Sequence, residues 1–166
     1  PVLFSLANII LIYKLTMLLT KNQISATISA LLMAFFPVDI IYATINFVDS
    51  RSVFFINLGI YFLFLAYEKQ NFKFSIYSGI AFFFSLQFKV NIFFHVLLLL
   101  VLYLYLYLKY KKSHSYLLMP VCFIVLNIFI EGMIYSNVYH DFFYRYHMME
   151  QNYIFCKNDF FTLGST

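Results

Sequence analysis

The sequence predicts an all-α, polytopic membrane protein with about six transmembrane helices. Of its 166 residues, 63% are hydrophobic and only 11% are charged, whereas a soluble domain carries about 25% charged residues. Apolar runs of about 20 residues recur along the chain, which is the length a helix needs to cross a hydrocarbon core of about 30 Å. Continuous apolar runs such as Val96–Leu108 lack the alternation expected of a membrane β-barrel. The composition therefore excludes a soluble globule.

Apolar segments, separated by short polar turns or by proline, are the expected membrane spans. In chain order they are Val2–Leu19, Ile24–Phe36, Ser52–Tyr67, Phe74–Phe88, Ile92–Leu108 and Tyr116–Ile130. Lys14 interrupts the first span and is long enough to reach the nearer interface. Pro37 ends the second, because proline lacks a backbone N–H and clashes with the preceding turn. Residues 1–133 are thus expected to form a transmembrane domain, and residues 134–166 an external interfacial segment.

Lysines gather in alternate turns, and basic residues accumulate on the cytoplasmic side of membrane proteins. The lysine-rich turns hold Lys21, Lys69, Lys73, Lys109, Lys111 and Lys112. Threading the spans with these turns inside places Asp49, Lys89 and the segment after Glu131 together on the external side. The expected location is the plasma (inner) membrane, with the functional face outside or in the periplasm. The net charge of +4 marks loop orientation, and no nucleic-acid partner is predicted.

The stretch Phe36–Asp49, read together with Lys89, is the candidate site. It contains Tyr42 and Asp49, and Arg51 follows directly. Acids at membrane depth are costly, so they usually face a cavity or a substrate. The Asp49 carboxylate suits a divalent metal ion or an acceptor hydroxyl, and Lys89 is suited to a phosphate. The plainer alternatives are a solvated acid paired with Arg51 and a lysine that extends to water.

A second group of titratable side chains follows the last span: His140, Asp141, His147 and Glu150. The two histidines lie two helical turns apart, which is not the i, i+4 spacing of a helix-borne zinc site. The favoured interpretation is an amphipathic segment on the membrane surface. Its expected anchors are aromatic: Tyr139, Phe142, Phe143 and Tyr146.

The pattern Pro37–x4–Tyr42–x6–Asp49, followed at once by an apolar span, resembles the third-helix region of the GT-C glycosyltransferases. Gly79 and Lys89 match a further feature of that family, a helix that contains a glycine and a lysine ten residues after it. The similarity is to the dolichyl-phosphate-mannose protein mannosyltransferase-like (ArnT-like) membrane enzymes. It covers most of the chain.

The resemblance implies transfer of a hexosyl or pentosyl group from a polyprenyl-phosphate-linked donor to an acceptor hydroxyl on the external face. The acceptor is a protein, a lipid or a glycan. In the family, an acid in the first external loop is the catalytic base, and a metal ion or basic side chains stabilise the leaving phosphate. By resemblance, Asp49 is the acid on the metal or acceptor side and Lys89 contacts the donor phosphate. Tyr42 and Arg51 are assigned to substrate binding.

The chain departs from the family pattern in one respect, because no acidic residue precedes Asp39. The catalytic base is therefore expected upstream of Pro1, and the chain is expected to be a piece of a longer enzyme.

Other functions compatible with this composition are a lipid-linked saccharide transporter or flippase, a polysaccharide polymerase and a structural subunit. A transporter predicts polar residues at mid-depth and broken helices in paired halves. A structural subunit requires no polar rim. The gathering of polar residues at one rim favours external surface chemistry, which a polymerase would share.

Overall fold

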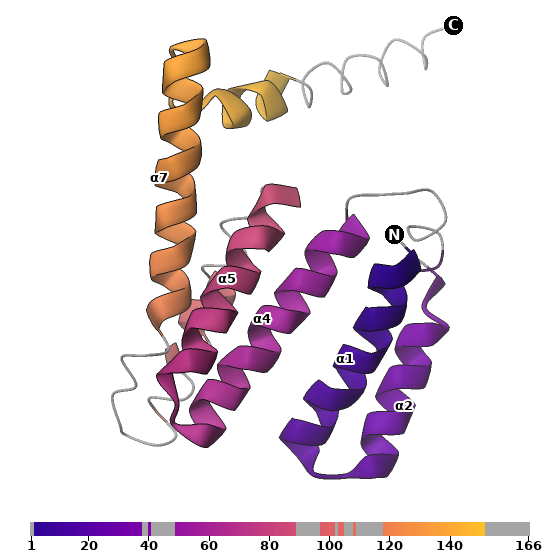
Figure 1. Cartoon of the computed structure of the whole chain (residues 1–166). Coiled ribbons are helices and arrows are strands. Elements are labelled where there is room, and N and C mark those ends of the chain that lie inside the picture. Colours follow the sequence, from indigo (N-terminus) through magenta and orange to yellow (C-terminus); the bar gives the residue numbers. More distant parts are fainter. Residues whose placement is uncertain are drawn as a thin grey trace, which may run out of the picture. The chain divides into compact units, whose positions relative to one another are not determined.

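The described part of the chain is helical throughout. The computed structural model describes residues 2–37, 40, 49–88, 97–101, 103–104, 108 and 118–151. The labelled helices of Figure 1 are α1 (Val2–Thr20), α2 (Gln23–Ala34), α4 (Asp49–Lys69), α5 (Phe72–Phe88) and α7 (Met119–Tyr139). No strand occurs within these ranges. The chain divides into two compact units, residues 1–125 (unit 1) and residues 126–166 (unit 2).

Three of the described helices are long and apolar enough to cross a membrane: α1, α4 from Ser50 onward, and α7. Helix α2 is apolar but shorter. Many large hydrophobic side chains are exposed, among them Leu3 (80%) and Phe35 (75%), and a soluble monomer rarely tolerates such contiguous apolar surface. The prediction of an all-α polytopic membrane protein is confirmed. The predicted span Ile92–Leu108 lies largely outside the described residues.

The last described helix extends beyond the span predicted for it. Helix α7 continues to Tyr139, although the expected span ends at Ile130. The acid at the predicted boundary, Glu131, lies within the helix because glutamate is a good helix former, and its carboxylate forms an ion pair with Arg145 of the following segment. The external segment expected from residue 134 thus starts within α7, and its position outside the membrane stays a prediction.

Unit 1 contains two helical hairpins, α1–α2 and α4–α5. Helix α1 packs against both α2 and α4, and α4 packs against α5, so the four helices form a row in the order α2, α1, α4, α5 (Figure 1). The two hairpin turns lie at one end of this row, whereas α4 begins and α5 ends at the other (Figure 1). An ion pair joins Lys21 of the first turn to Glu68 beside the second. We call these the turn end and the open end of unit 1.

Helices α4 and α5 approach closely because small residues line their interface. The buried face of α5 carries Ser75, Ser78, Gly79, Ala81, Phe82, Ser85 and Leu86. The Ser78 hydroxyl donates to the Gly59 carbonyl over 2.7 Å, and the Ser52 hydroxyl donates to the Ser85 carbonyl over 3.3 Å. Small residues and interhelical hydrogen bonds are the usual means by which helices associate in lipid, where burial of apolar area gives little advantage.

A side-chain hydrogen bond between two asparagines joins the two hairpins in mid-helix. Asn57 Nδ2 of α4 donates to Asn8 Oδ1 of α1 over 2.9 Å. Asn8 is only 1% exposed, and its own Nδ2 has no hydrogen-bond partner. Buried amides that lack a partner destabilise a fold, so the bond from Asn57 is needed to offset part of the cost of burying Asn8.

Three helix ends are built by the same two-residue device. The first residue adopts the left-handed conformation and ends one helix: Lys21 (φ 54°), Gln70 (φ 50°) and His140 (φ 56°). The next residue is Asn or Asp, and its side chain accepts the N–H of the residue two positions on: Asn22 from Ile24 (2.9 Å), Asn71 from Lys73 (3.0 Å) and Asp141 from Phe143 (2.9 Å). A left-handed residue after a helix and an Asn or Asp cap before one are both common terminators. Each corner is therefore encoded by two adjacent residues.

Candidate functional site

Two of the predicted site residues, Asp49 and Arg51, belong to the start of α4 at the open end of unit 1. Asp49 is the first residue of α4, and Phe88, the residue before Lys89, is the last of α5. Two contacts hold these helix ends together: the Ser52–Ser85 hydrogen bond and the guanidinium of Arg51, which lies 5.9 Å from the centre of the Phe88 ring. Tyr42, Lys89 and the side chain of Asp49 lie outside the described residues. Arg51 is the one predicted site residue whose side chain is described.

Arg51 lies over a cluster of aromatic rings. Phe88 stacks on Phe55 with ring centres 5.7 Å apart and planes 13° apart, and Phe84 lies 5.6 Å from the same Phe55 ring. Phe4 of α1 also contacts Phe55, with ring centres 6.0 Å apart. A cation over an aromatic face is stabilised by the ring quadrupole, so Phe88 favours the position of a permanent positive charge at the open end. Guanidinium groups suit the recognition of phosphate.

Sequence reasoning missed this aromatic cluster. The i, i+4 spacing of Phe84 and Phe88 places both rings on one face of α5, and this was an available signal. Phe4 belongs to a different hairpin, and its contact with Phe55 depends on the packing of α1 against α4. No local sequence pattern predicts this contact.

An open apolar groove of about 340 Å³ continues from the cluster along α4 and α5. It is lined by Phe55, Leu58, Phe62, Tyr77, Ile80, Ala81 and Phe84. A groove with this lining suits a hydrocarbon chain, whose apolar surface is covered without leaving any polar group unpaired.

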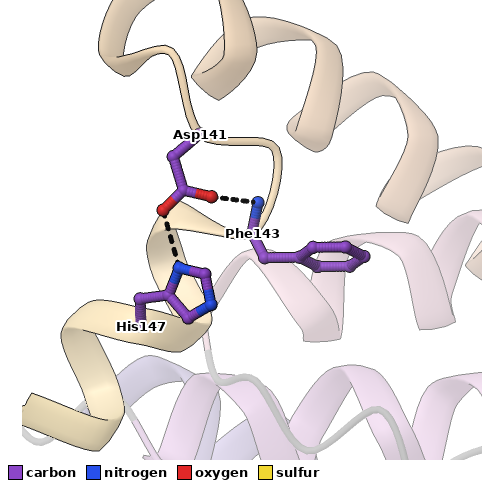
Figure 2. A network of polar contacts seen from close by, with 3 residues as sticks. All are labelled: Asp141, Phe143 and His147. Carbon is purple, nitrogen blue, oxygen red and sulfur yellow. Dashed lines mark hydrogen bonds and ion pairs between the residues drawn. The ribbon is translucent and has the colours of Figure 1, made fainter.

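The titratable cluster after α7 forms a small polar network, drawn in Figure 2. Asp141 Oδ2 lies 2.7 Å from Nδ1 of His147, and Asp141 Oδ1 accepts the N–H of Phe143. The hydrogen bond with His147 lowers the pKa of Asp141, and the bond from Phe143 lowers it further against the opposing effect of desolvation. Both carboxylate oxygens of Asp141 thus have partners within the corner that follows α7.

No metal site forms in the part of the chain that the structure describes, where no three His, Cys, Asp or Glu side chains come together. Of the predicted membrane anchors, Tyr139 and Phe143 are exposed, whereas the ring of Phe142 lies against Gly132. The interfacial position of these rings stays a prediction.

Unit 2 also contains an ion pair and a tyrosine stack that sequence reasoning did not find. Glu131 pairs with Arg145, and both side chains are mostly buried. Burial and the nearby Glu131 carboxylate raise the pKa of Tyr146, while Arg145 lowers it. Tyr139 and Tyr144 stack with ring centres 3.9 Å apart, and Tyr135 lies against both rings. These contacts fold the segment after α7 back onto the helix.

Comparison with known proteins gives one family. The model of the dolichyl-phosphate-mannose-protein mannosyltransferase family matches residues 1–130. This match covers most of the chain and includes the positions of all four predicted site residues. No curated protein and no solved structure gives a significant match. The family match confirms the resemblance found in the sequence and establishes a transferase in place of a transporter or a structural subunit. The chain, a membrane glycosyltransferase of the GT-C type, therefore belongs to the dolichyl-phosphate-mannose-protein mannosyltransferase family.

Proposed function

We propose that the protein transfers a hexosyl or pentosyl group from a polyprenyl-phosphate-linked donor to an acceptor hydroxyl on the external face of the plasma (inner) membrane. The acceptor is a protein, a lipid or a glycan. The reaction takes place at the open end of unit 1, where Asp49 begins α4 and Lys89 follows α5. The family match supports the reaction class.

In this proposal the cationic residues bind the donor phosphate. Lys89 contacts the phosphate, and Arg51 adds a second positive charge close by. The negative charge on the phosphate grows as the sugar leaves, and fixed cations lower the barrier by stabilising that charge. The cluster of Phe55, Phe84 and Phe88 supports this role, because it holds the guanidinium in place before the substrate binds.

The acceptor side is assigned to Asp49 and Tyr42. A carboxylate accepts a hydrogen bond from an acceptor hydroxyl and orients it toward the sugar, and the tyrosine contacts the acceptor. A divalent ion at Asp49 stays a prediction. Within the described residues of unit 1 the other carboxylate is Glu68 at the turn end, so no step is assigned to a metal. Transfer measured before and after chelation tests that prediction.

The observation that carries the proposal is the contact of Arg51 with Phe88. It brings the start of α4 and the end of α5, 37 positions apart in the chain (88 − 51), to one end of the helix pair. The apolar groove of about 340 Å³ that starts beneath these rings gives the polyprenyl chain a place beside its phosphate. The phosphate of the donor would thus lie beside the cationic residues, and its polyprenyl chain in the adjacent apolar groove.

The test is a transfer assay with the full-length protein in membranes. A radiolabelled polyprenyl-phosphate sugar and the corresponding nucleotide sugar are supplied separately, and transfer is expected with the lipid-linked donor alone. Asp49→Asn and Lys89→Ala are each expected to lower the rate at least about 100-fold, the size of effect that follows loss of one group stabilising a transition state.

Matched controls come from the other ends of the same helices. Glu68→Gln removes an acid at the far end of α4, and Lys73→Ala removes a lysine at the far end of α5. Both are expected to keep wild-type transfer. Undiminished transfer in Asp49→Asn and Lys89→Ala would overturn the site, and transfer from the nucleotide sugar would overturn the donor class.

A further inference from the structure

A second groove, at the turn end of unit 1, carries two lysines and two tyrosines. It has a volume of about 370 Å³ and is lined by Tyr13, Lys14, Met17, Leu18, Lys21 and Tyr61. Lys14 lies six residues before the end of α1, and Tyr61 lies eight before the end of α4. At 1.5 Å per residue, they lie roughly 9–12 Å from the helix ends. The groove therefore lies about two helical turns from the ends of α1 and α4, and we expect it at the depth of the lipid headgroups and the upper acyl chains.

Lys14 is the one charged residue of α1. It is exposed, and no carboxylate among the described residues forms an ion pair with it. A cation at membrane depth is costly unless an anion or the interface receives it. Lys14 thus presents an unneutralised positive charge to whatever molecule fills the groove.

The surroundings add further positive charge. Lys21, which follows the end of α1, lines the same groove and pairs with Glu68, the one acid described at this end. Lys69 and Lys73 lie in and beside the second turn. The four lysines outnumber the single carboxylate, so the turn end of unit 1 carries an excess of positive charge.

We propose that this groove binds the headgroup phosphate of an anionic phospholipid. Lys14 forms the ion pair, the hydroxyls of Tyr13 and Tyr61 donate hydrogen bonds, and Met17 and Leu18 contact the start of an acyl chain. The mixed lining favours a lipid over a soluble anion, which would leave the apolar part of the groove uncovered. The site lies at the end of α1 and α4 opposite Arg51, so it is distinct from the proposed donor site and does not depend on it.

The proposal is tested with the full chain in nanodiscs that contain phosphatidylcholine and a minor fraction of phosphatidylglycerol. The protein is extracted in mild detergent, and the lipids that remain bound are counted by native mass spectrometry. We expect phosphatidylglycerol to be enriched. Lys14→Gln is expected to lower that enrichment about fivefold, the effect of one lysine near an anionic surface. Lys14→Arg, which keeps the charge, is expected to retain it.

Three further variants distinguish a specific binding site from general electrostatic attraction. Glu68→Gln frees Lys21 from its carboxylate and is expected to increase the enrichment, whereas Lys73→Gln removes a lysine at the same end but outside the groove and is expected to change it little. Tyr61→Phe alters no charge and is expected to lower the enrichment by loss of one hydrogen bond. Equal loss in Lys73→Gln and Lys14→Gln, or no enrichment of phosphatidylglycerol in the wild type, would overturn the proposal.

Discussion

Asp141 uses both oxygens of one carboxylate to shape the corner after α7. Oδ1 accepts the Phe143 N–H, and Oδ2 contacts the His147 ring (Figure 2). The lowered pKa of Asp141 in the folded protein means that ionisation of this carboxylate stabilises the fold. That stabilisation is fully present above about pH 4, the ordinary pKa of aspartate. It is lost as the pH falls through the lower pKa of the folded state.

We therefore expect the helical segment 144–151 to open at acidic pH before α7 does. Amide hydrogen exchange of residues 143–147, followed as the pH is lowered, measures this. Asp141→Asn keeps an oxygen to accept the Phe143 N–H but removes the charge, so it should lose the acid dependence. Asp141→Ala, which also lacks the cap, should exchange faster at every pH. An unchanged acid dependence in Asp141→Asn would exclude this carboxylate as the cause.

Gly79 offers a second test on a single residue. A Cβ atom at this position would overlap the ring of Phe123, although alanine is ordinarily the better helix former by about 1 kcal/mol. Overpacking of this kind costs about 1–3 kcal/mol, so Gly79→Ala is expected to lower thermal stability in detergent.

The matched control for Gly79→Ala is the neighbouring Ile80→Ala, since Ile80 lies on an exposed face and should tolerate the change. Adding Phe123→Leu to Gly79→Ala should recover part of the loss. A melting temperature that rises in Gly79→Ala would show that the two helices separate at this position without penalty. Close packing against Phe123 thus explains why a glycine occupies position 79, one of the positions that carry the family resemblance.

At the scale of elements, the hairpins are joined by amide groups rather than by apolar packing alone. Asn57→Leu removes the donor to Asn8. Both the oxygen and the nitrogen of the buried Asn8 amide then lack a hydrogen-bond partner. We expect it to destabilise the protein by about 0.6 kcal/mol and at most about 1.7 kcal/mol, the range for such bonds in membranes. Reversible unfolding in bicelles measures the change.

The double variant Asn8→Leu/Asn57→Leu controls for the buried polar group itself. Removing both amides should restore most of the stability, because nothing unpaired remains. The coupling free energy of the double-mutant cycle isolates the bond. Additive effects of the two substitutions would show that the amides do not interact.

Helix positions followed closely from the sequence because apolar runs and polar turns are local signals. The expected spans Val2–Leu19 and Phe74–Phe88 differ from α1 and α5 by one residue and two residues at one end. Helix α2 ends at Ala34, three residues before Pro37, as expected from the restriction that proline places on the residues before it. Helix α7 continues to Tyr139, beyond the expected end of the span at Ile130. The ion pair of Glu131 with Arg145 was not predicted, because no local pattern connects the two residues.

The lysine-rich turns predict the orientation of the whole protein in the membrane. Both described turns lie at the same end of unit 1 (Figure 1), as alternate threading requires. After Cys122 and Cys156 are replaced by serine, single cysteines report the side. Gln23→Cys and Lys73→Cys should react with a membrane-impermeant maleimide only after permeabilisation, because lysine-rich turns face the cytoplasm.

Cysteines at the opposite side complete that experiment. Phe36→Cys, beyond the end of α2, and Met149→Cys, in the segment after α7, should react in intact cells, since both side chains are exposed. Labelling of Gln23→Cys in intact cells would invert the topology and move the proposed site to the cytoplasm.

The gathering of the predicted site residues at one face stays a prediction, and the contacts around Arg51 were not predictable from the sequence. Asp49 and Lys89 were assigned to one face from lysine counts and span lengths, and the start of α4 does lie beside the end of α5. The packing of Arg51 on Phe88, and of Phe4 on Phe55, depends on which helix faces are buried. The pattern of apolar residues does not show which face of a helix is buried, because nearly every face of these helices is apolar.

The two-residue corners impose an order on assembly. Lys21–Asn22 and Gln70–Asn71 each specify a hairpin from adjacent residues, so each pair of helices can insert as soon as it leaves the translocation machinery. The bonds between hairpins, Asn8–Asn57 and Lys21–Glu68, join residues 49 and 47 positions apart. Contacts of such separation carry a larger loop-closure cost. We therefore expect the hairpins to dock after each has formed, and the asparagine pair to form in this second step.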